Sequence, residues 1–258
     1  GLDLKNITFD QVKYEDEALD AKGYLKAFDP LTGEELWNVD HVHYWNSGVV
    51  ATAGGLVFQG DGLGYLSAYN TDNGEKLWTY NTYISMLAPP VTYEIDGEQY
   101  VVILAGTGGV ENFFGYTNDT AAIKYGNFNK LLGFKLDANL QMVAPNILDR
   151  TIPEQPELAA SKEDLVRGEQ LYNISCGACH GANAKSGGVL PDLRMMTPET
   201  HRIFKNIVVD GIYAGKGMAG FGDILNEKDT EMIRQYVISR ALIDKAEAEA
   251  IEASAGGG

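Results

Sequence analysis

The chain has 258 residues, enough for one or two domains with a sizeable buried core. Its 20 basic and 36 acidic side chains give a formal net charge of −16, which argues against nucleic acid or an anionic membrane as a partner and suits docking on a basic or neutral protein. No apolar run reaches the about 18 residues of a membrane span, and 30 glycines with 14 tyrosines favour turn-rich β-structure in part of the chain. Because the sequence begins at Gly1, we expect a processed product or part of a longer protein.

The first half contains two copies of one pattern. Residues 27–37 and 68–78 both pass from a strand through a turn of Asp or Asn and Gly to a second strand that begins Leu-Trp. The copies are about 40 residues apart, a spacing typical of propeller blades. Asp96-Gly97 predicts a further hairpin. The strands predicted from alternating side chains span residues 23–28, 49–53, 56–59, 64–69, 91–94 and 100–105.

Residues 1–145 are therefore predicted to form a partial β-propeller. A closed propeller has about four to eight blades, and this length supplies fewer than four at the observed period. Open blades would leave strand edges unpaired and half of a core uncovered. We expect this half to require a companion segment for its stability.

The pattern changes after the blades. Residues 146–160 contain Pro153 and Pro156 among acidic neighbours, which predicts a semi-rigid linker. Residues 161–245 have helical periodicity and are predicted to form an all-α domain. Residues 246–258, acidic and alanine-rich and then glycine-only, are predicted to be a flexible tail.

Three helix starts can be located in the second half. Ser161, Thr197 and Asn226 are typical N-cap residues, and Pro198 follows the second of them. A glycine inside a helix costs about 1 kcal/mol, so Gly168 in the first helix indicates the close approach of another helix. The second helix is predicted to bury Ile203, Phe204, Ile207 and Val208.

The stretch Cys176-Gly177-Ala178-Cys179-His180 has the pattern of a c-type haem attachment sequence. Its spacing allows Cys176 and Cys179 each to add to one haem vinyl group and places His180 beneath the iron as proximal ligand. A zinc half-site and a redox dithiol are the alternatives, but the chain has no other cysteine to complete a zinc site.

Met218 is expected to be the sixth iron ligand. It lies in a glycine-dense loop that can bring backbone close to a flat porphyrin, and enough chain separates it from His180 for a helix. A thioether ligand raises the reduction potential relative to two histidines, which suits a haem that accepts electrons. Met195, Met196 and His201 are the competing candidates.

Both halves resemble the same group of proteins. The repeat at residues 27–37 and 68–78 resembles the tryptophan-docking motif of dehydrogenases that use pyrroloquinoline quinone (PQQ), with Asn70 in place of the usual aspartate. Residues 186–194 together with 217–221 closely resemble the cytochrome domain of quinohaemoprotein alcohol dehydrogenases. The resemblance covers most of the chain, and the order of its domains agrees.

The resemblance implies a multidomain fold, in which the last all-β blades of an eight-bladed quinoprotein propeller precede an all-α class I cytochrome c domain. It implies a periplasmic enzyme in which PQQ oxidises an alcohol to an aldehyde and haem c passes the electrons to a periplasmic or membrane acceptor. The calcium site, the catalytic aspartate and most PQQ contacts would lie in an N-terminal propeller portion. No catalytic residue is therefore expected in this chain.

The resemblance also assigns roles to four residues. Trp45, Asn46 and Val110 lie where family members line or approach PQQ, and Asn46 could donate hydrogen bonds to it. The carbonyl of Pro191 would accept the ring N–H of His180. The structural alternatives are a blade-core tryptophan, a turn asparagine, a loop-end valine and a turn proline.

Two other functions compete with the enzyme. One is a stand-alone electron-carrier cytochrome with a β-repeat docking module. The other is a structural propeller scaffold whose haem serves assembly rather than turnover. The sequence does not determine the identity of the substrate, because hydroxylase and polymer-oxidising relatives of the alcohol enzymes share these motifs.

Overall fold

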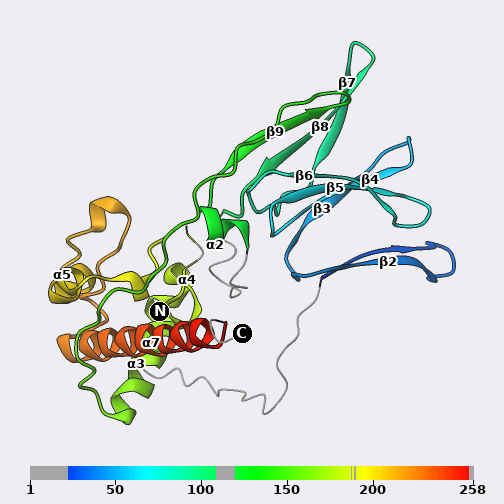
Figure 1. Ribbon diagram of the computed structural model, residues 1–258. Coiled ribbons are helices and arrows are strands. Elements are labelled where there is room, and N and C mark those ends of the chain that lie inside the picture. Colours follow the sequence, from blue (N-terminus) through cyan, green and yellow to red (C-terminus); the bar gives the residue numbers. More distant parts are fainter. Residues whose placement is uncertain (1–22, 109–119, 187, 189, 256–258) are drawn as a thin grey trace. The chain divides into compact units, whose positions relative to one another are not determined.

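The computed structural model describes residues 23–108, 120–186, 188 and 190–255 (Figure 1). These residues divide into two compact units. The first unit contains the described residues up to Leu148 and is built from sheets, and the second begins at Asp149 and is helical. Among the described residues, no helix is both long and apolar enough to span a lipid bilayer.

The β unit consists of three antiparallel sheets with two, four and three strands. The four-stranded sheet has the meander order β3-β4-β5-β6 of a complete propeller blade. All six strands predicted from the sequence are present, within a few residues of their expected ends. In chain order the strands are β1 (Gly23–Phe28), β2 (Glu35–His41), β3 (Asn46–Ala51), β4 (Leu56–Asp61), β5 (Tyr65–Asn70), β6 (Lys76–Asn81), β7 (Val91–Ile95), β8 (Glu98–Ala105) and β9 (Lys130–Lys135).

The two sequence repeats form hairpins with the same turn chemistry. In the first, the Asp29 Oδ1 atom accepts a hydrogen bond of 2.7 Å from the Leu31 backbone N–H. In the second, Asn70 Oδ1 accepts one of 2.7 Å from the Asp72 N–H. The substitution of asparagine for aspartate therefore preserves the turn, because both side chains present an acceptor oxygen two residues before the donor.

The tryptophan of the first repeat docks on the second repeat. Trp37 Nε1 donates a 2.8 Å hydrogen bond to the carbonyl oxygen of Thr71. A Cβ atom at Gly74 would lie 2.7 Å from the Trp37 ring, so only glycine leaves room for the indole. Trp37 therefore has a structural role, because it joins the two-stranded sheet to the four-stranded one.

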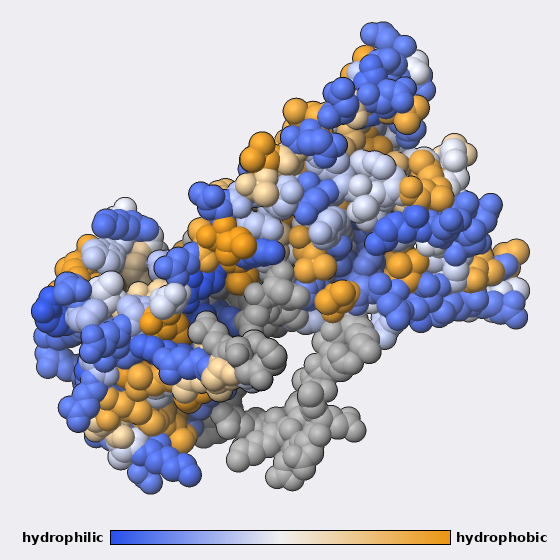
Figure 2. All heavy atoms as spheres, in the orientation of Figure 1, coloured by the Kyte–Doolittle hydropathy of each residue, from blue (hydrophilic) through white to orange (hydrophobic). Residues whose placement is uncertain are grey.

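Exposed apolar side chains of the β unit form separate orange patches among hydrophilic residues on the face shown in Figure 2. The two-stranded sheet carries Phe28 and Leu36, each more than half exposed, and the three-stranded sheet carries Leu131 at 72% exposure. Within the part of the chain that the structure describes, two of the three sheets also have fewer strands than the complete blade. These features agree with blades that normally pack against a companion segment.

The helical unit is built around one pair of helices. In chain order its α-helices are α3 (Lys162–Ser175), α4 (Gly177–His180), α5 (Pro198–Arg202), α6 (Phe204–Val208) and α7 (Glu227–Ala255), with single 3-10 turns η2 (Ala182–Ala184), η3 (Leu193–Met195) and η4 (Ala214–Lys216). The three predicted N-caps are confirmed. Ser161 accepts from the Asp164 N–H, Thr197 from the Thr200 N–H, and Asn226 from the Asp229 N–H.

Gly168 makes the packing of α3 against α7 possible. A Cβ atom at this position would lie 2.2 Å from the carbonyl oxygen of Met232, inside any allowed contact. One turn further along, the rings of Tyr172 and Tyr236 pack with centroids 5.2 Å apart. The close helix approach that the sequence indicated is confirmed.

The structure differs from the predictions at four points. The helix that starts after Thr197 is interrupted at Ile203, which is 37% exposed rather than buried, whereas Phe204, Ile207 and Val208 are buried as predicted. Helix α7 continues to Ala255, through most of the segment predicted to be a tail, because alanine and glutamate are strong helix formers. The short elements α2 (Ala121–Tyr125) and β9 were not predicted.

Candidate functional site

The Cys176–His180 motif lies at the end of α3 and forms the single turn α4. The N–H of Cys176 donates to the Tyr172 carbonyl at 2.8 Å, and the N–H of His180 donates to the Cys176 carbonyl at 2.8 Å. Cys176 is buried, Cys179 is exposed, and His180 is buried. The turn thus brings two thiols and an imidazole onto one short, rigid segment.

The chain is held immediately after His180 by its neighbours. Gly181 has a φ angle of 80°, and a Cβ atom on it would lie 2.0 Å from the Lys185 carbonyl oxygen, so glycine is required. The hydroxyl of Tyr172 donates a 2.7 Å hydrogen bond to the Gly181 carbonyl. Burial raises the pKa of the Tyr172 hydroxyl, so this group remains a donor at neutral pH.

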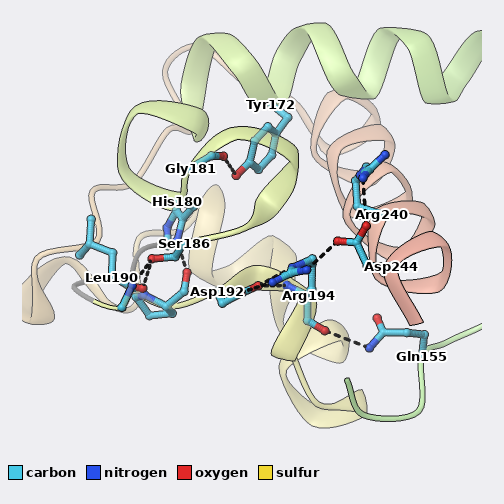
Figure 3. A network of polar contacts seen from close by, with 12 residues as sticks. Gln155, Tyr172, His180, Gly181, Ser186, Leu190, Asp192, Arg194, Arg240 and Asp244 are labelled. Atoms are coloured by element: carbon cyan, nitrogen blue, oxygen red, sulfur yellow. Dashed lines mark hydrogen bonds and ion pairs between the residues drawn. The ribbon is translucent and has the colours of Figure 1, made fainter. Parts of the chain in front are cut away.

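The imidazole of His180 has one ring nitrogen engaged. Its Nδ1 atom lies 2.8 Å from the carbonyl oxygen of Pro191 (Figure 3). A carbonyl only accepts, so Nδ1 carries the proton and Nε2 is the nitrogen with which the ring can bind a metal. This is the contact that the resemblance implied for Pro191.

Buried Cys176 does not have the environment of a reactive thiol. Burial raises the pKa of the Cys176 thiol to about 12, whereas reactive Cys-X-X-Cys thiols have a lowered pKa. Among the described residues, no group of three or more His, Cys, Asp and Glu side chains is placed to hold a metal ion. The raised pKa of the Cys176 thiol argues against a redox role for that cysteine.

Met218 lies in a loop that is tied to α6. The N–H of Phe221 donates to the Val208 carbonyl at 2.7 Å, and the N–H of Met218 donates to the Tyr213 carbonyl at 3.2 Å. A Cβ atom at Gly222 would lie 2.7 Å from the Val209 carbonyl oxygen. Only glycine at this position therefore allows the loop to come so close to Val209. Met218 and Phe221 pack against the same apolar cluster that contains Cys176.

Two of the competing candidates have defined surroundings, and Met196 shares the buried cluster that contains Cys176. Met196 is 7% exposed and is part of the buried core cluster. The Nε2 atom of His201 lies 3.2 Å from Gln155 Oε1 of the linker. Burial lowers the pKa of His201 to about 4, so this ring is neutral at physiological pH.

The structure describes two of the three residues expected near PQQ, Trp45 and Asn46. Asn46 Nδ2 donates a 2.7 Å hydrogen bond to the His43 carbonyl, which uses one of its two N–H groups, and its buried Oδ1 has no partner among the described residues. The ring of Trp45 lies 5.8 Å from that of Tyr44. Val110 lies outside the described residues.

Sequence reasoning missed a buried charged cluster beside His180. Arg194, Asp192 and Asp244 are joined by ion pairs of 2.6 Å. Asp192 and Arg194 follow Pro191 closely in the sequence, which was a usable signal. Asp244, on α7, could not have been linked to them from spacing alone.

Two models of known protein families match separate parts of the chain. The PQQ_2 family model, described as Outer membrane protein assembly factor BamB, matches residues 21–112. A second model, described as Cytochrome C oxidase, cbb3-type, subunit III, matches residues 163–237.

The proteins similar to this chain include quinohemoprotein alcohol dehydrogenases. ADH IIB of Pseudomonas putida is 38% identical over 224 residues, which cover 86% of this chain and 32% of that protein. ADH-IIG of Pseudomonas putida is 39% identical over 220 residues, covering 85% and 30%. The solved structure of quinohemoprotein alcohol dehydrogenase ADHIIG from Pseudomonas putida HK5 superposes with a TM-score of 0.75 over 85% of this chain and 32% of that one. The chain thus spans about a third of the length of the curated relatives it matches.

Proposed function

We propose that this chain is the C-terminal portion of a quinohaemoprotein alcohol dehydrogenase, and that its helical unit carries the haem c through which electrons leave the enzyme. The observation that carries the proposal is the His180 environment. The histidine of a haem attachment sequence has its Nδ1 fixed by a carbonyl, which is the orientation that an axial ligand needs. The tryptophan-docked blades preceding it in the same chain support the quinoprotein part of the proposal.

The residues present fit a covalently attached haem. Cys176 and Cys179 would hold it through thioether bonds, His180 would bind the iron through Nε2, and Met218 would supply the sixth ligand. When bound, such a haem supplies one-electron redox chemistry. Met218 and Phe221 pack against the buried apolar cluster that contains Cys176, which gives this part of the unit an apolar lining.

The chain's own residues set the properties of such a centre. The Pro191 carbonyl holds the proton on Nδ1 of His180 and increases the basicity of Nε2. Tyr172 and Gly181 fix the turn that presents the ring. The thioether of Met218 favours the reduced state relative to a second histidine, which suits acceptance of electrons from a reduced quinone.

The quinone site is shared with the N-terminal propeller portion. In this proposal Asn46 contributes its remaining N–H group to PQQ, and Trp45 and Val110 line the approach to the cofactor. The N-terminal portion holds the calcium ion, the base that removes the alcohol proton and most of the PQQ contacts. This chain contributes no catalytic base, and the alcohol is converted to an aldehyde at the shared site.

The acceptor and location follow from the same assignment. We place the enzyme in the periplasm, where it passes electrons to a periplasmic or membrane acceptor. The net charge of −16 suits an acceptor with a basic docking face.

Haem attachment is the first test of this function. The chain is produced with a cytochrome c maturation system, denatured, and examined for haem that stays bound to the polypeptide. The parent chain should retain haem after denaturation, and Cys176→Ala with Cys179→Ala should lose it. A parent chain that leaves this system without bound haem would contradict the proposal.

A further inference from the structure

Arg194 is a buried cation in the helical unit, with 6% of its surface exposed. Its Nε and Nη2 atoms donate to the two carboxylate oxygens of Asp192 at 3.0 and 2.6 Å. Its Nη1 atom donates to Oδ2 of Asp244 at 2.6 Å. The other oxygen of Asp244 accepts from Arg240 Nη2 at 3.0 Å, so the cluster contains two cations and two anions.

The cluster is connected by one peptide unit to the carbonyl that holds His180. Asp192 directly follows Pro191, whose carbonyl lies 2.8 Å from His180 Nδ1. On the other side of Pro191, the Ser186 hydroxyl donates to the Leu190 carbonyl. Figure 3 shows the resulting chain of contacts from Asp244 through Arg194 and Asp192 to the segment beside His180. The carbonyl is thus fixed from both sides.

The backbone of Arg194 is anchored as well as its side chain. Its N–H donates to Asp192 Oδ1 at 3.1 Å, which closes the η3 turn. Its carbonyl accepts from Nε2 of Gln155 in the linker at 3.3 Å. The loop from Pro191 to Arg194 is therefore held by α7 through Asp244 and by the linker through Gln155.

Such a cluster is a poor device for stability alone. The cost of removing charges from water can cancel their attraction, and apolar replacements of similar volume are often as stable. What a guanidinium provides is geometry, because its planar fork makes several hydrogen bonds in fixed directions. The fork of Arg194 fixes the Asp192 carboxylate relative to α7.

We propose that Arg194, held between Asp192 and Asp244, is a positioning residue for His180. It fixes the Pro191 carbonyl and thereby sets the orientation and basicity of the imidazole that binds the haem iron. This inference rests on the proposed haem ligation by His180. Loosening the carbonyl weakens its hydrogen bond to Nδ1, makes the imidazole less basic and favours the reduced haem.

The test compares three charge-conserving variants of the full, haem-loaded chain. Arg194→Lys keeps the charge but cannot form the fork, and Asp244→Glu keeps the charge but displaces the carboxylate. Arg202→Lys is the matched control, because the Arg202 side chain, which pairs with Glu199, is 71% exposed. The reduction midpoint is measured by anaerobic titration, the Nδ1–H proton of His180 is followed by NMR in the reduced state, and thermal unfolding is recorded.

Arg194→Lys and Asp244→Glu should shift the reduction equilibrium toward the reduced form by about threefold or more, and the Nδ1–H proton should exchange faster with solvent. Arg202→Lys should match the parent. Lower thermal stability with an unchanged midpoint and an unchanged Nδ1–H proton would show that the cluster is only structural and would overturn the inference. Asp244→Glu, which lies on α7, provides the test if Arg194→Lys does not fold. A parent chain without covalent haem would instead contradict the proposed function.

Discussion

The two units of this chain differ in how completely they bury their apolar surface. In the helical unit, Tyr172, Ile233 and Val237 have no exposed surface at all, and α3 packs directly against α7. In the β unit, one of the three sheets formed by the described residues has four strands, and Phe28, Leu36 and Leu131 remain more than half exposed. Both units contain buried apolar clusters, but the sheets of the β unit also carry exposed apolar side chains, a surface suited to further blades. Mutations should therefore affect the two units differently.

The largest effect is expected from breaking the buried ion pairs of the helical unit. Arg194→Met leaves the buried carboxylate of Asp192 without its ion-pair partner and leaves Asp244 paired with Arg240 alone. Removing one member of a buried pair costs about 3–5 kcal/mol, so the free energy of unfolding of the helical unit should fall by that amount. Calorimetry of the haem-loaded chain measures it. Arg202→Met, at an exposed pair, should change it by less than about 0.5 kcal/mol, and equal effects of the two variants would contradict the assignment.

The second-largest effect is expected from disturbing the packing of α3 against α7. Gly168→Ala places a methyl group 2.2 Å from the Met232 carbonyl oxygen, and overpacking of this kind costs about 1–3 kcal/mol. Gly215→Ala is the control, because nothing lies within 4 Å of a Cβ atom there. Chemical denaturation followed by circular dichroism should show a lower midpoint for Gly168→Ala alone. An unchanged midpoint would mean that the helices do not pack so closely.

A smaller effect is expected in the β unit alone. Trp37→Phe removes the hydrogen bond to the Thr71 carbonyl and should destabilise the joined sheets by about 1–2 kcal/mol. Trp78→Phe should cost less, because Trp78 is 40% exposed and stacks on Tyr80. Limited proteolysis should show faster cleavage of the blades in Trp37→Phe with no change in the helical unit. Equal protection of the blades in Trp37→Phe and the parent would argue against docking.

The smallest effect at neutral pH concerns His201. Burial lowers its pKa from the usual 6.5 to about 4, so the unfolded chain binds more protons between these values. Stability contributed by the neutral ring should therefore fall as the pH falls from about 6.5 to 4, and rise in the other direction. Replacement by Gln should make the unfolding midpoint less dependent on pH in this window. A variant with the same slope as the parent would show that His201 does not titrate there.

In both units, the elements that could be predicted are those whose signal is local in the sequence. Local turn chemistry located most strands: Asp96 and Gly97 have φ angles of 54° and 79°, as their hairpin requires. N-caps located the helix starts for the same reason, since their signal lies within three residues. What could not be predicted depends on contacts between distant segments.

Two residues illustrate that limit. Asp244 pairs with Arg194 across 50 positions of the sequence, and no spacing pattern connects them. Ile203 has the apolar character of a buried helix residue, but the chain turns there and leaves it partly exposed. In the candidate site, the haem motif and Pro191 were found from sequence, whereas the cluster that holds Pro191 was not.

The central claim is that the haem of this chain lies downstream of an alcohol-oxidising quinone. The most direct measurement is an anaerobic visible spectrum of the chain with its N-terminal propeller portion, before and after addition of calcium, PQQ and a primary alcohol. Sharp reduced c-type haem bands should appear only after the alcohol is added. If no alcohol reduces a haem that dithionite still reduces, the dehydrogenase assignment is contradicted and an electron-carrier module remains.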